Sequence, residues 1–226
     1  MEQLSSERVI AFDTETTGLS PKNERIVEIA AMEFDIKTGV TGRYFHAYIN
    51  PEIPIPYRSS LVHGLTDKFI ADKPLFAEVA PHFIRFISGA ILFAHNAPFD
   101  IRFVNSELER LGLEPITVYA KEVNCTRAMA RKAHPGQKAT LDALCDRYQV
   151  DRSGRTVHGA LIDCQLLAGV YPQLAADVEL NKDLVKEPKK RVSKSTSVVL
   201  PLVQATPVVK SRFSSVSAFF SKAKLA

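Results

Sequence analysis

Short apolar runs and alternating patterns near the start of the chain predict strands. Residues 8–12 (RVIAF) form an apolar run that ends at a polar cluster, which is typical of a buried strand. Residues 25–34 and 43–49 are rich in β-branched and aromatic residues, and the segment between them, 38–42 (TGVTG), has the composition of a turn. These two segments therefore predict an antiparallel pair of strands.

Further along, apolar residues recur at the spacing of a helix. This spacing predicts helices over residues 74–87, 98–111, 141–148 and 159–174. Pro98 favours the start of the second helix and Gly112 its end, and Thr140 is placed to cap the third. A second fully apolar run, 90–94 (AILFA), predicts another buried strand. Leading strands followed by helices and further strands predict an α/β fold with a mixed sheet flanked by helices.

The composition fits a globular protein with a real core. Of the 226 residues, 46% are hydrophobic and 24% are charged, which excludes global disorder. No apolar run approaches the roughly 18 residues that a membrane span needs, and the N-terminus shows no basic segment followed by an apolar one. We therefore expect a cytoplasmic protein without a membrane partner. The three cysteines form no Cys-x-x-Cys pair, so a zinc ribbon or a thioredoxin-type site is excluded.

Charge divides the chain into two parts. Residues 1–180 hold 19 Lys and Arg against 23 Asp and Glu, whereas residues 181–226 hold 10 against 2. The second part opens with a charged stretch containing proline, and its apolar islands are too short to make a domain. We predict a folded domain over 1–180 and a basic, mostly disordered tail over 181–226 that docks on a partner. An acidic body suits metal binding better than passive phosphate binding.

Asp13 and Glu15 stand two residues apart where the first apolar run ends. Side chains alternate across a strand, so these two carboxylates point to the same face. Left bare they would repel each other, and one would tend to hold a proton. Mg²⁺ or Mn²⁺, which prefer carboxylate oxygens, would resolve this repulsion. The alternative is a polar loop at the strand end in which Asp13 and Thr14 act only as caps.

Three further residues complete a candidate site. Asp100 follows the second apolar run, where sites form in open α/β sheets, although a carboxylate in the first turn of a helix is also a common dipole partner. Asp163 lies within an apolar helix, at the rim of the core, and needs a partner there. His158 immediately precedes that helix, where it serves as a base or simply as a cap or surface residue.

Four carboxylates and a histidine suit phosphodiester hydrolysis. Two metal ions about 4 Å apart can clamp the attacking water and the leaving oxygen of a phosphodiester. A neutral imidazole can take the proton of the water. The chain has no Gly-x-x-x-x-Gly-Lys loop, no Gly-x-Ser-x-Gly elbow and no Gly-x-Gly-x-x-Gly fingerprint, so the sequence offers no comparable alternative chemistry.

Three segments in order resemble the motifs of a known family. Residues 13–18 (DTETTG), 95–103 (HNAPFDIRF) and 158–163 (HGALID) are similar to the three exonuclease motifs of the DnaQ-like family, of the subtype with histidine in its third motif. The stretches 62–66, 73–79 and 141–145 further resemble proofreading subunits of bacterial replicative DNA polymerases. The resemblance covers about residues 8–178.

The resemblance implies a ribonuclease H-like fold and 3′→5′ exonuclease activity with two divalent metal ions, Mg²⁺ or Mn²⁺. By motif position, the metal ligands would be Asp13, Glu15, Asp100 and Asp163. His158 would be the general base. The residues expected to contact the substrate are Asp13, Glu15, Thr16, His63, Asn96 and Asp163.

The resemblance also implies partners. They are the single-stranded or frayed 3′ end of DNA, the catalytic subunit of a polymerase and, through the tail, a sliding clamp. Residues 216–220 (VSAFF) are vaguely similar to clamp-binding peptides but lack the leading glutamine, and an apolar anchor or low complexity is an equal alternative. Two other functions stay open: an exonuclease that trims RNA or single-stranded DNA on its own, and an inactive exonuclease fold that serves as a scaffold.

Overall fold

The computed structural model describes residues 7–35, 39–155 and 157–181. Its helices and strands, in chain order, are β1 (Val9–Thr16), β2 (Ile26–Asp35), β3 (Gly39–Tyr48), α1 (Tyr57–His63), α2 (Asp67–Ile70), α3 (Phe76–Ile87), β4 (Ile91–Ala94), α4 (Ala97–Arg110), α5 (Ile116–Tyr119), β5 (Glu122–Cys125), α6 (Thr126–Ala133), α7 (Leu141–Tyr148) and α8 (Ala160–Leu180). The predicted basic tail lies outside the described residues.

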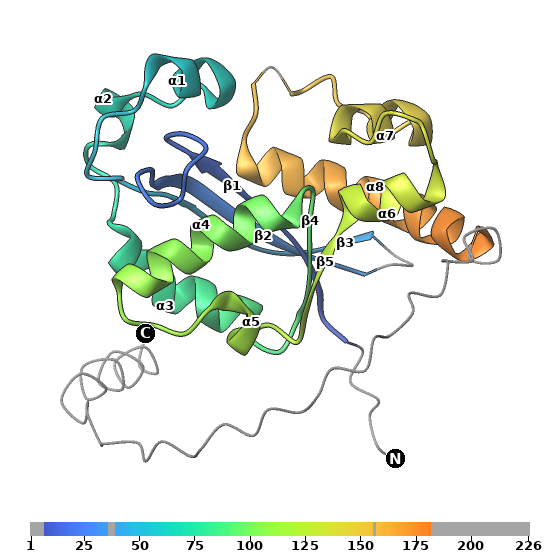
Figure 1. Ribbon diagram of the computed structural model, residues 1–226, viewed down its shortest axis with the longest axis horizontal. Coiled ribbons are helices and arrows are strands. Elements are labelled where there is room, and N and C mark those ends of the chain that lie inside the picture. The colour runs from blue at the N-terminus through green and yellow to red at the C-terminus, as the bar shows by residue number, and fades with distance from the viewer. Residues whose placement is uncertain (1–6, 36–38, 156, 182–226) are drawn as a thin grey trace, which may run out of the picture. The chain divides into compact units, whose positions relative to one another are not determined.

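A five-stranded mixed sheet organises the fold. The strand order is β3-β2-β1-β4-β5 (Figure 1). β1 pairs with β2 and β2 with β3 in antiparallel fashion, whereas β1 and β4 are parallel, as are β4 and β5. The mixed sheet with flanking helices predicted from the sequence is therefore confirmed. β1 is central, so both of its edges are paired and both of its faces are covered.

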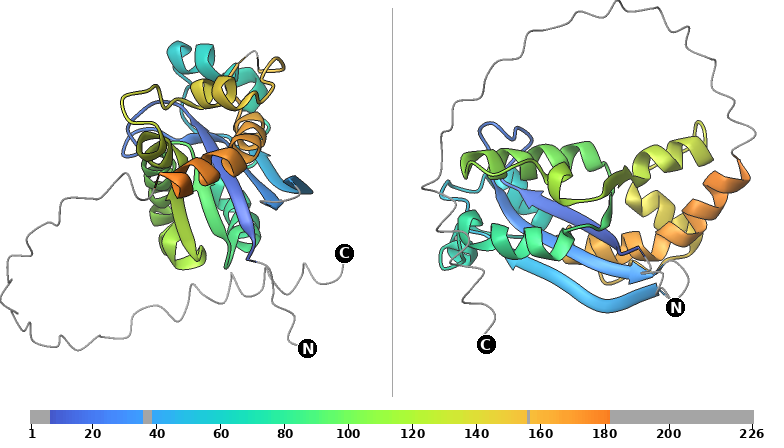
Figure 2. Two further views of the ribbon diagram at one scale, coloured as in Figure 1. Left: turned by 90° about the vertical axis from the view of Figure 1, so that its right-hand side faces the viewer. Right: turned by 90° about the horizontal axis from the view of Figure 1, so that it is seen from below.

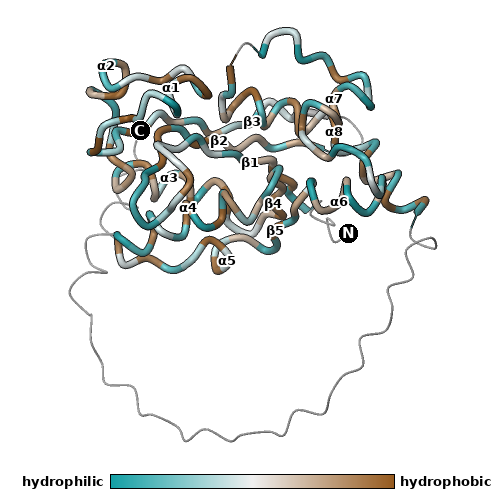
Figure 3. The backbone as a smooth tube through the Cα atoms, turned by 45° about the horizontal axis from the view of Figure 1, so that its top comes forward, coloured by the Kyte–Doolittle hydropathy of each residue, from teal (hydrophilic) through white to brown (hydrophobic). Residues whose placement is uncertain are grey.

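Alternate side chains of β1 enter two different cores. Ile10 and Phe12 pack in a cluster with buried residues of α3, α4 and α5. Val9 and Ala11 pack in a second cluster with buried residues of α6, α7 and α8. The two groups of helices cover the two faces of the sheet (Figure 2). Hydrophobic and hydrophilic positions alternate along these helices, as expected for helices with one buried side (Figure 3).

This alternation also directs the polar end of β1. Asp13 and Glu15 continue the series of Val9 and Ala11 and therefore face the α8 side of the sheet. Thr14 continues the series of Ile10 and Phe12, and its hydroxyl reaches Asp100 on α4. A strand that changes from apolar to polar composition at residue 13 thus sends acidic groups to one face and hydroxyl groups to the other.

The sequence predicted the longer elements well and the shorter ones poorly. The helices over 74–87, 98–111 and 141–148 are confirmed as α3, α4 and α7, and Thr140 caps α7 by accepting a hydrogen bond from the amide of Ala143. β1 runs on to Thr16, beyond the predicted end at residue 12, because its pairing with β2 continues. Five elements were missed: the short α1, α2, α5 and β5, and α6, whose buried side consists of small residues.

No helix among the described residues is long and apolar enough to cross a bilayer. The cytoplasmic location remains a prediction.

Candidate active site

β1 carries two acidic side chains side by side into the interior. Asp13 and Glu15 lie within the strand, rather than after it, and Glu15 is 8% exposed. The register places Glu15 directly opposite Glu28 of β2, which is 4% exposed and accepts a hydrogen bond from His46 Nε2 at 2.8 Å. Like charges directly opposite each other destabilise a sheet, so this arrangement needs a compensating cation or proton.

Asp100 reaches the same place from α4. Asn96, between β4 and α4, adopts a left-handed backbone conformation (φ 77°) and is the N-cap residue of α4. Pro98 lies in the first turn of that helix. Asp100, in the first turn, is 2% exposed. Its Oδ1 accepts hydrogen bonds from the amide and the hydroxyl of Thr14, at 3.1 and 2.8 Å. These bonds fix the carboxylate against β1.

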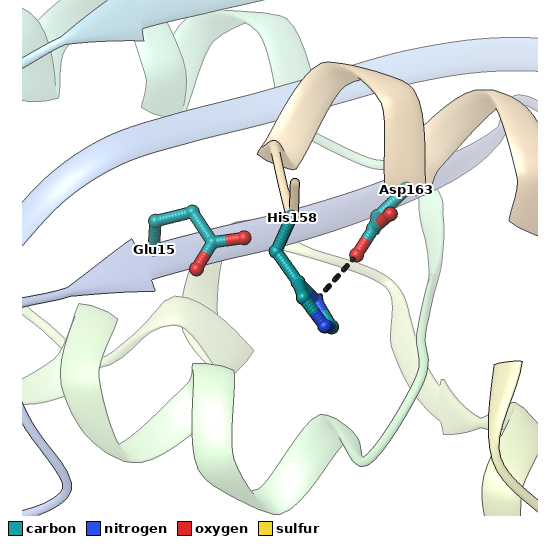
Figure 4. Close-up of side chains that lie close together, drawn as sticks. All are labelled: Glu15, His158 and Asp163. Carbon is teal, nitrogen blue, oxygen red and sulfur yellow. Dashed lines mark ion pairs between the residues drawn. The ribbon is translucent and has the colours of Figure 1, made fainter. Parts of the chain in front are cut away.

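Asp163 and His158 come from the start of α8 and the segment before it. The amide of His158 donates to the carbonyl of Val62, which joins this segment to the end of α1. Ligand atoms of Glu15, His158 and Asp163 all lie within 4.8 Å of one another (Figure 4). His158 Nδ1 is 3.4 Å from Asp163 Oδ2, and its side chain is half exposed. Residues separated by most of the chain thus meet at one point.

These groups line a cleft of about 420 Å³. The lining residues are Asp13, Thr14, Glu15, His95, Phe99, Asp100, Arg127, Thr140, Leu141, Asp142, Arg155, His158 and Asp163. Five of them are the four carboxylates and the histidine predicted from the sequence. The structure therefore brings this predicted set together in one accessible site.

Three of the four carboxylates hold their protons unusually strongly. Burial, followed by the charges of Asp100 and Glu15, raises the pKa of Asp13 well above its usual range. Burial, followed by the charge of Asp163, raises the pKa of Glu15 to about 8. Burial also raises the pKa of Asp100 to about 7, although the bonds from Thr14 oppose the rise. The site thus has a strong affinity for positive charge, either protons or a cation.

Asp163 differs from these three because it forms an ion pair with Arg155. Burial alone would raise the pKa of Asp163, but the nearby ring of His158 and the hydrogen bonds from Arg155 outweigh it and lower the pKa. The Nε and Nη2 of Arg155 donate to the two carboxylate oxygens of Asp163 at 2.6 and 2.7 Å. Such two-fold contacts between a guanidinium and a carboxylate are among the stronger ion pairs in proteins.

The family model described as "Exonuclease" (RNase_T) matches residues 10–171, which include all five acidic and histidine groups of the cleft. The chain belongs to the exonuclease family. The match extends from β1 to α8, the two elements that supply three of the four carboxylates, so it covers the whole described site.

Individual relatives show which exonucleases this chain is similar to. It is 42% identical over 211 residues to the DNA polymerase III subunit epsilon of Rickettsia felis, covering 88% of this chain and 92% of that protein. It is 51% identical over 174 residues to the subunit epsilon of Rickettsia conorii, covering 76% and 75%. Among solved structures, Exonuclease X in complex with 5′ overhanging duplex DNA is similar, with a TM-score of 0.58, 28% identity, and coverage of 74% of this chain and 91% of that one.

The site of this exonuclease suits the divalent metal ions on which its family depends. The donors are buried carboxylate oxygens with one imidazole nitrogen nearby, a set that hard divalent cations accept. The raised pKa values of Glu15 and Asp100 show that the carboxylates lack sufficient compensation from the surrounding protein. The residues present therefore fit a metal ion.

Three residues expected to contact substrate do not line this cleft. Thr16 is buried, and its hydroxyl donates to the carbonyl of Gly18 at 2.6 Å. His63 is buried at the end of α1, where its Nδ1 accepts from the amide of Leu65, while Nε2 has no hydrogen-bond partner among the described residues. Asn96 lies at the turn into α4. Their roles as substrate contacts stay predictions.

Sequence reasoning missed other residues of the cleft and its surroundings. Arg155 and Asp142 form an ion pair at 2.7 Å on the cleft wall, and Glu28 adds a negative charge behind Glu15. The burial of His95 lowers its pKa to about 4, so this ring is neutral at physiological pH. A polar residue within an apolar strand, as Glu28 is within 25–34, was a usable signal. The sequence held no comparable signal for Arg155, because its two acidic partners, Asp142 and Asp163, lie on separate helices.

The raised pKa values predict that metal binding strengthens with pH. At about pH 6, Glu15 and Asp100 are largely protonated in the folded protein, and a metal ion must displace those protons. We expect the affinity for Mn²⁺ to rise by about tenfold or more between about pH 6 and about pH 8.5. Calorimetry in buffers of different ionisation enthalpy should also detect proton release. An affinity that stays constant over this range, with no protons released, would contradict the expectation.

Proposed function

We propose that this exonuclease removes nucleoside monophosphates from the 3′ ends of DNA and serves as the proofreading subunit of a replicative DNA polymerase. The observation that carries the proposal is the convergence in one cleft of four carboxylates from β1, α4 and α8 and of His158 from the segment before α8: Asp13, Glu15, Asp100, Asp163 and His158. Relatives named DNA polymerase III subunit epsilon, at 42–51% identity over most of the chain, support the polymerase assignment.

The four carboxylates are the proposed metal ligands. Asp13, Glu15, Asp100 and Asp163 would hold two divalent ions, Mg²⁺ or Mn²⁺. When bound, the ions supply positive charge that stabilises the developing charge on the phosphodiester and makes a water molecule more acidic. Thr14 orients Asp100, which lines the cleft, through two hydrogen bonds to its Oδ1.

His158 is the proposed general base. Its Nδ1 accepts a hydrogen bond from Nη2 of Arg155 at 2.7 Å, because a guanidinium can only donate. In this arrangement the ring proton is on Nε2, and the lone pair of Nδ1 is occupied. When Nδ1 instead carries the proton and donates to Asp163 Oδ2, which is 3.4 Å away, Nε2 is left as a free acceptor for the proton of water.

The size of the cleft explains how a mismatch would be recognised. A cleft of about 420 Å³ has room for a single nucleotide, and three of the four carboxylates are buried within it. A strand end must therefore unpair before it reaches the carboxylates, and a mismatched end costs less energy to unpair than a matched one. Selectivity for mismatched ends follows from this difference, with no need for the site to read the base.

A competition assay tests the proposed function. The purified chain is mixed with Mg²⁺ and with 5′-labelled single-stranded DNA and RNA of equal sequence, alongside the Asp100→Ala variant. We expect stepwise shortening of DNA from its 3′ end, faster than that of RNA, and lost in the variant. A matched and a mismatched primer end on the same template should then differ about tenfold in rate, because about 1–2 kcal/mol separates their unpairing costs.

The same assay separates the alternatives. Preferential shortening of RNA would show an RNA-trimming exonuclease that uses the same residues. Absence of any metal-dependent hydrolysis in a folded sample would show an inactive scaffold. Activity that survives in Asp100→Ala would refute the assignment of the site itself.

The basic segment 181–226 is the proposed contact with the polymerase, and with a sliding clamp, because its composition departs so sharply from that of the body. Removal of these residues is expected to leave hydrolysis of free single strands within about twofold of the full chain, since the proposed metal ligands and the proposed base all precede residue 181 in the sequence. Co-purification with the polymerase catalytic subunit should be lost. Retained co-purification would place the contact on the folded domain.

A further inference from the structure

The guanidinium of Arg155 is surrounded by acidic groups inside the cleft. Its side chain is 9% exposed, although it comes from the segment between α7 and α8, which has no helix or strand over most of its length. Two of its nitrogens hold both oxygens of Asp163, and the third, Nη1, donates to Asp142 at 2.7 Å. Asp163 therefore has no carboxylate oxygen without a bond to this cation.

Asp163 is unusual among the four proposed metal ligands in this respect. Within the described part of the chain, Asp13, Glu15 and Asp100 form no ion pair with a lysine or arginine. Arg155 thus pairs with one of the four proposed metal ligands, Asp163, and leaves the other three without a cationic partner among the described residues. A divalent ion that binds the cluster through Asp163 meets a cation that already occupies both of its oxygens.

We propose that Arg155 and the divalent metal ion compete for Asp163, and that metal binding displaces the guanidinium from at least one of the two carboxylate oxygens. The inference rests on the metal-dependent exonuclease function proposed above. Arg155 is then a positioning residue that sets how tightly the site holds its metal, rather than a group that touches the reacting atoms.

The surroundings of Arg155 provide for such an exchange. Asp142 is about half exposed on α7, and its bond to Nη1 is independent of the two bonds to Asp163. The guanidinium can therefore stay anchored on Asp142 when it leaves Asp163. Its segment adds few restraints of its own, because the described residues 149–155 and 157–159 include no helix or strand.

The same exchange affects His158. Nη2 of Arg155 is shared between Asp163 Oδ2 and His158 Nδ1, each at 2.7 Å. When Nη2 withdraws, the lone pair of Nδ1 is released. The half-exposed ring can then lose its Nε2 proton to water and take one up at Nδ1, so that Nδ1 donates to Asp163 and Nε2 becomes the free acceptor. Uptake of metal and release of the proposed base are thereby linked through a single side chain.

The test compares two arginines of the same segment. Arg155→Met removes the charge and keeps an apolar stem, whereas the matched control Arg152→Met removes a charge that pairs with the exposed Asp146 instead. The dissociation constant for Mn²⁺ is measured by calorimetry on the full chain, stripped with a chelator and without nucleic acid. We expect Arg155→Met to bind Mn²⁺ about tenfold more tightly than the wild type, and Arg152→Met to stay within about twofold.

A second measurement follows the displacement in the wild-type protein. Guanidinium Nε–H signals are recorded by nuclear magnetic resonance during titration with Mg²⁺, and the Arg155 signal is assigned by its absence in Arg155→Met. It should shift, and should exchange faster with solvent, at the same midpoint as Mg²⁺ binding. A signal unchanged by saturating Mg²⁺ would overturn the inference.

The outcomes distinguish this inference from the function on which it rests. If the wild type binds Mn²⁺ and Arg155→Met binds it equally or more weakly, Arg155 is no competitor, and the proposed exonuclease function stands. If the wild type takes up no metal, both the inference and the proposed function fail.

Should circular dichroism show that Arg155→Met does not fold, Arg155→Lys replaces it. Lysine keeps the charge but cannot hold both oxygens and Asp142 at once, so binding about threefold tighter than wild type is expected, and equal or weaker binding overturns the inference.

Discussion

Replacing Asp100 with asparagine is expected to abolish exonuclease activity and, at the same time, to stabilise the protein stripped of metal. The rate should fall by about a thousandfold or more, because an amide cannot supply the negative charge that holds a divalent ion. The side-chain oxygen of asparagine can still accept both hydrogen bonds from Thr14, so the local structure should be kept.

The gain in stability follows from the raised pKa of Asp100, about 7 in the folded protein. A group that binds its proton more tightly when folded supports the fold at low pH, and that support is lost as pH rises through the folded-state pKa. Asparagine carries no charge at any pH. In chelator at about pH 8.5, Asp100→Asn should therefore be more stable than wild type by on the order of 2–4 kcal/mol.

Urea denaturation at two pH values provides the measurement. The advantage of Asp100→Asn should be largest at about pH 8.5 and nearly absent at about pH 4, where the wild-type carboxyl is protonated. The control is Asp146→Asn, which changes an exposed carboxylate outside the cleft. A variant less stable than wild type at both pH values would show that burial of the Asp100 charge is not unfavourable.

Replacing His158 with glutamine is expected to lower kcat by about a hundredfold to a thousandfold, the usual contribution of a general base. The change should leave the affinity for Mn²⁺ within about threefold of wild type, because four carboxylates remain. The difference between a large loss of kcat and an unchanged affinity for Mn²⁺ is informative, because His158 lies close enough to Glu15 and Asp163 to serve as a metal ligand instead of a base.

Parallel measurement of single-turnover rate and of Mn²⁺ binding by calorimetry separates the two roles. Loss of metal affinity in proportion to the loss of rate would identify His158 as a ligand and refute its assignment as the base. His82→Gln is the matched control, because it changes an exposed histidine on α3, away from the cleft. It should change neither quantity by more than about twofold.

The sequence was informative where a single local rule decides the structure. A period of two placed Asp13 and Glu15 on one face of a strand, and the structure has them there. A buried strand followed by a helix placed Asp100 near them, because parallel strands bring their carboxyl ends to one edge. The apolar pattern of α8 marked Asp163 as a carboxylate at the rim of the core, and it is 6% exposed.

Features that depend on the meeting of distant segments escaped prediction. Arg155 looks like an ordinary basic residue of a loop, and its role follows only from the approach of Asp142 on α7 and Asp163 on α8. Glu28 and Glu15 are separated by the turn between β1 and β2, and only the register sets them opposite each other. β5 has a single strongly apolar residue, Val123, so pairing with β4, rather than its own pattern, makes it a strand.

The packing of the first strand against the last helix has a consequence for synthesis of the chain. Val9 and Ala11 share a core with residues of α8, and the thiol of Cys164 contacts the carbonyl of Ala30 at 3.6 Å. Asp163 is therefore translated long after the carboxylates that it joins. A nascent chain halted before α8 lacks both this ligand and the helix that covers one face of the sheet. We therefore expect prematurely terminated products to be inert toward DNA, and nuclease activity to require translation through α8.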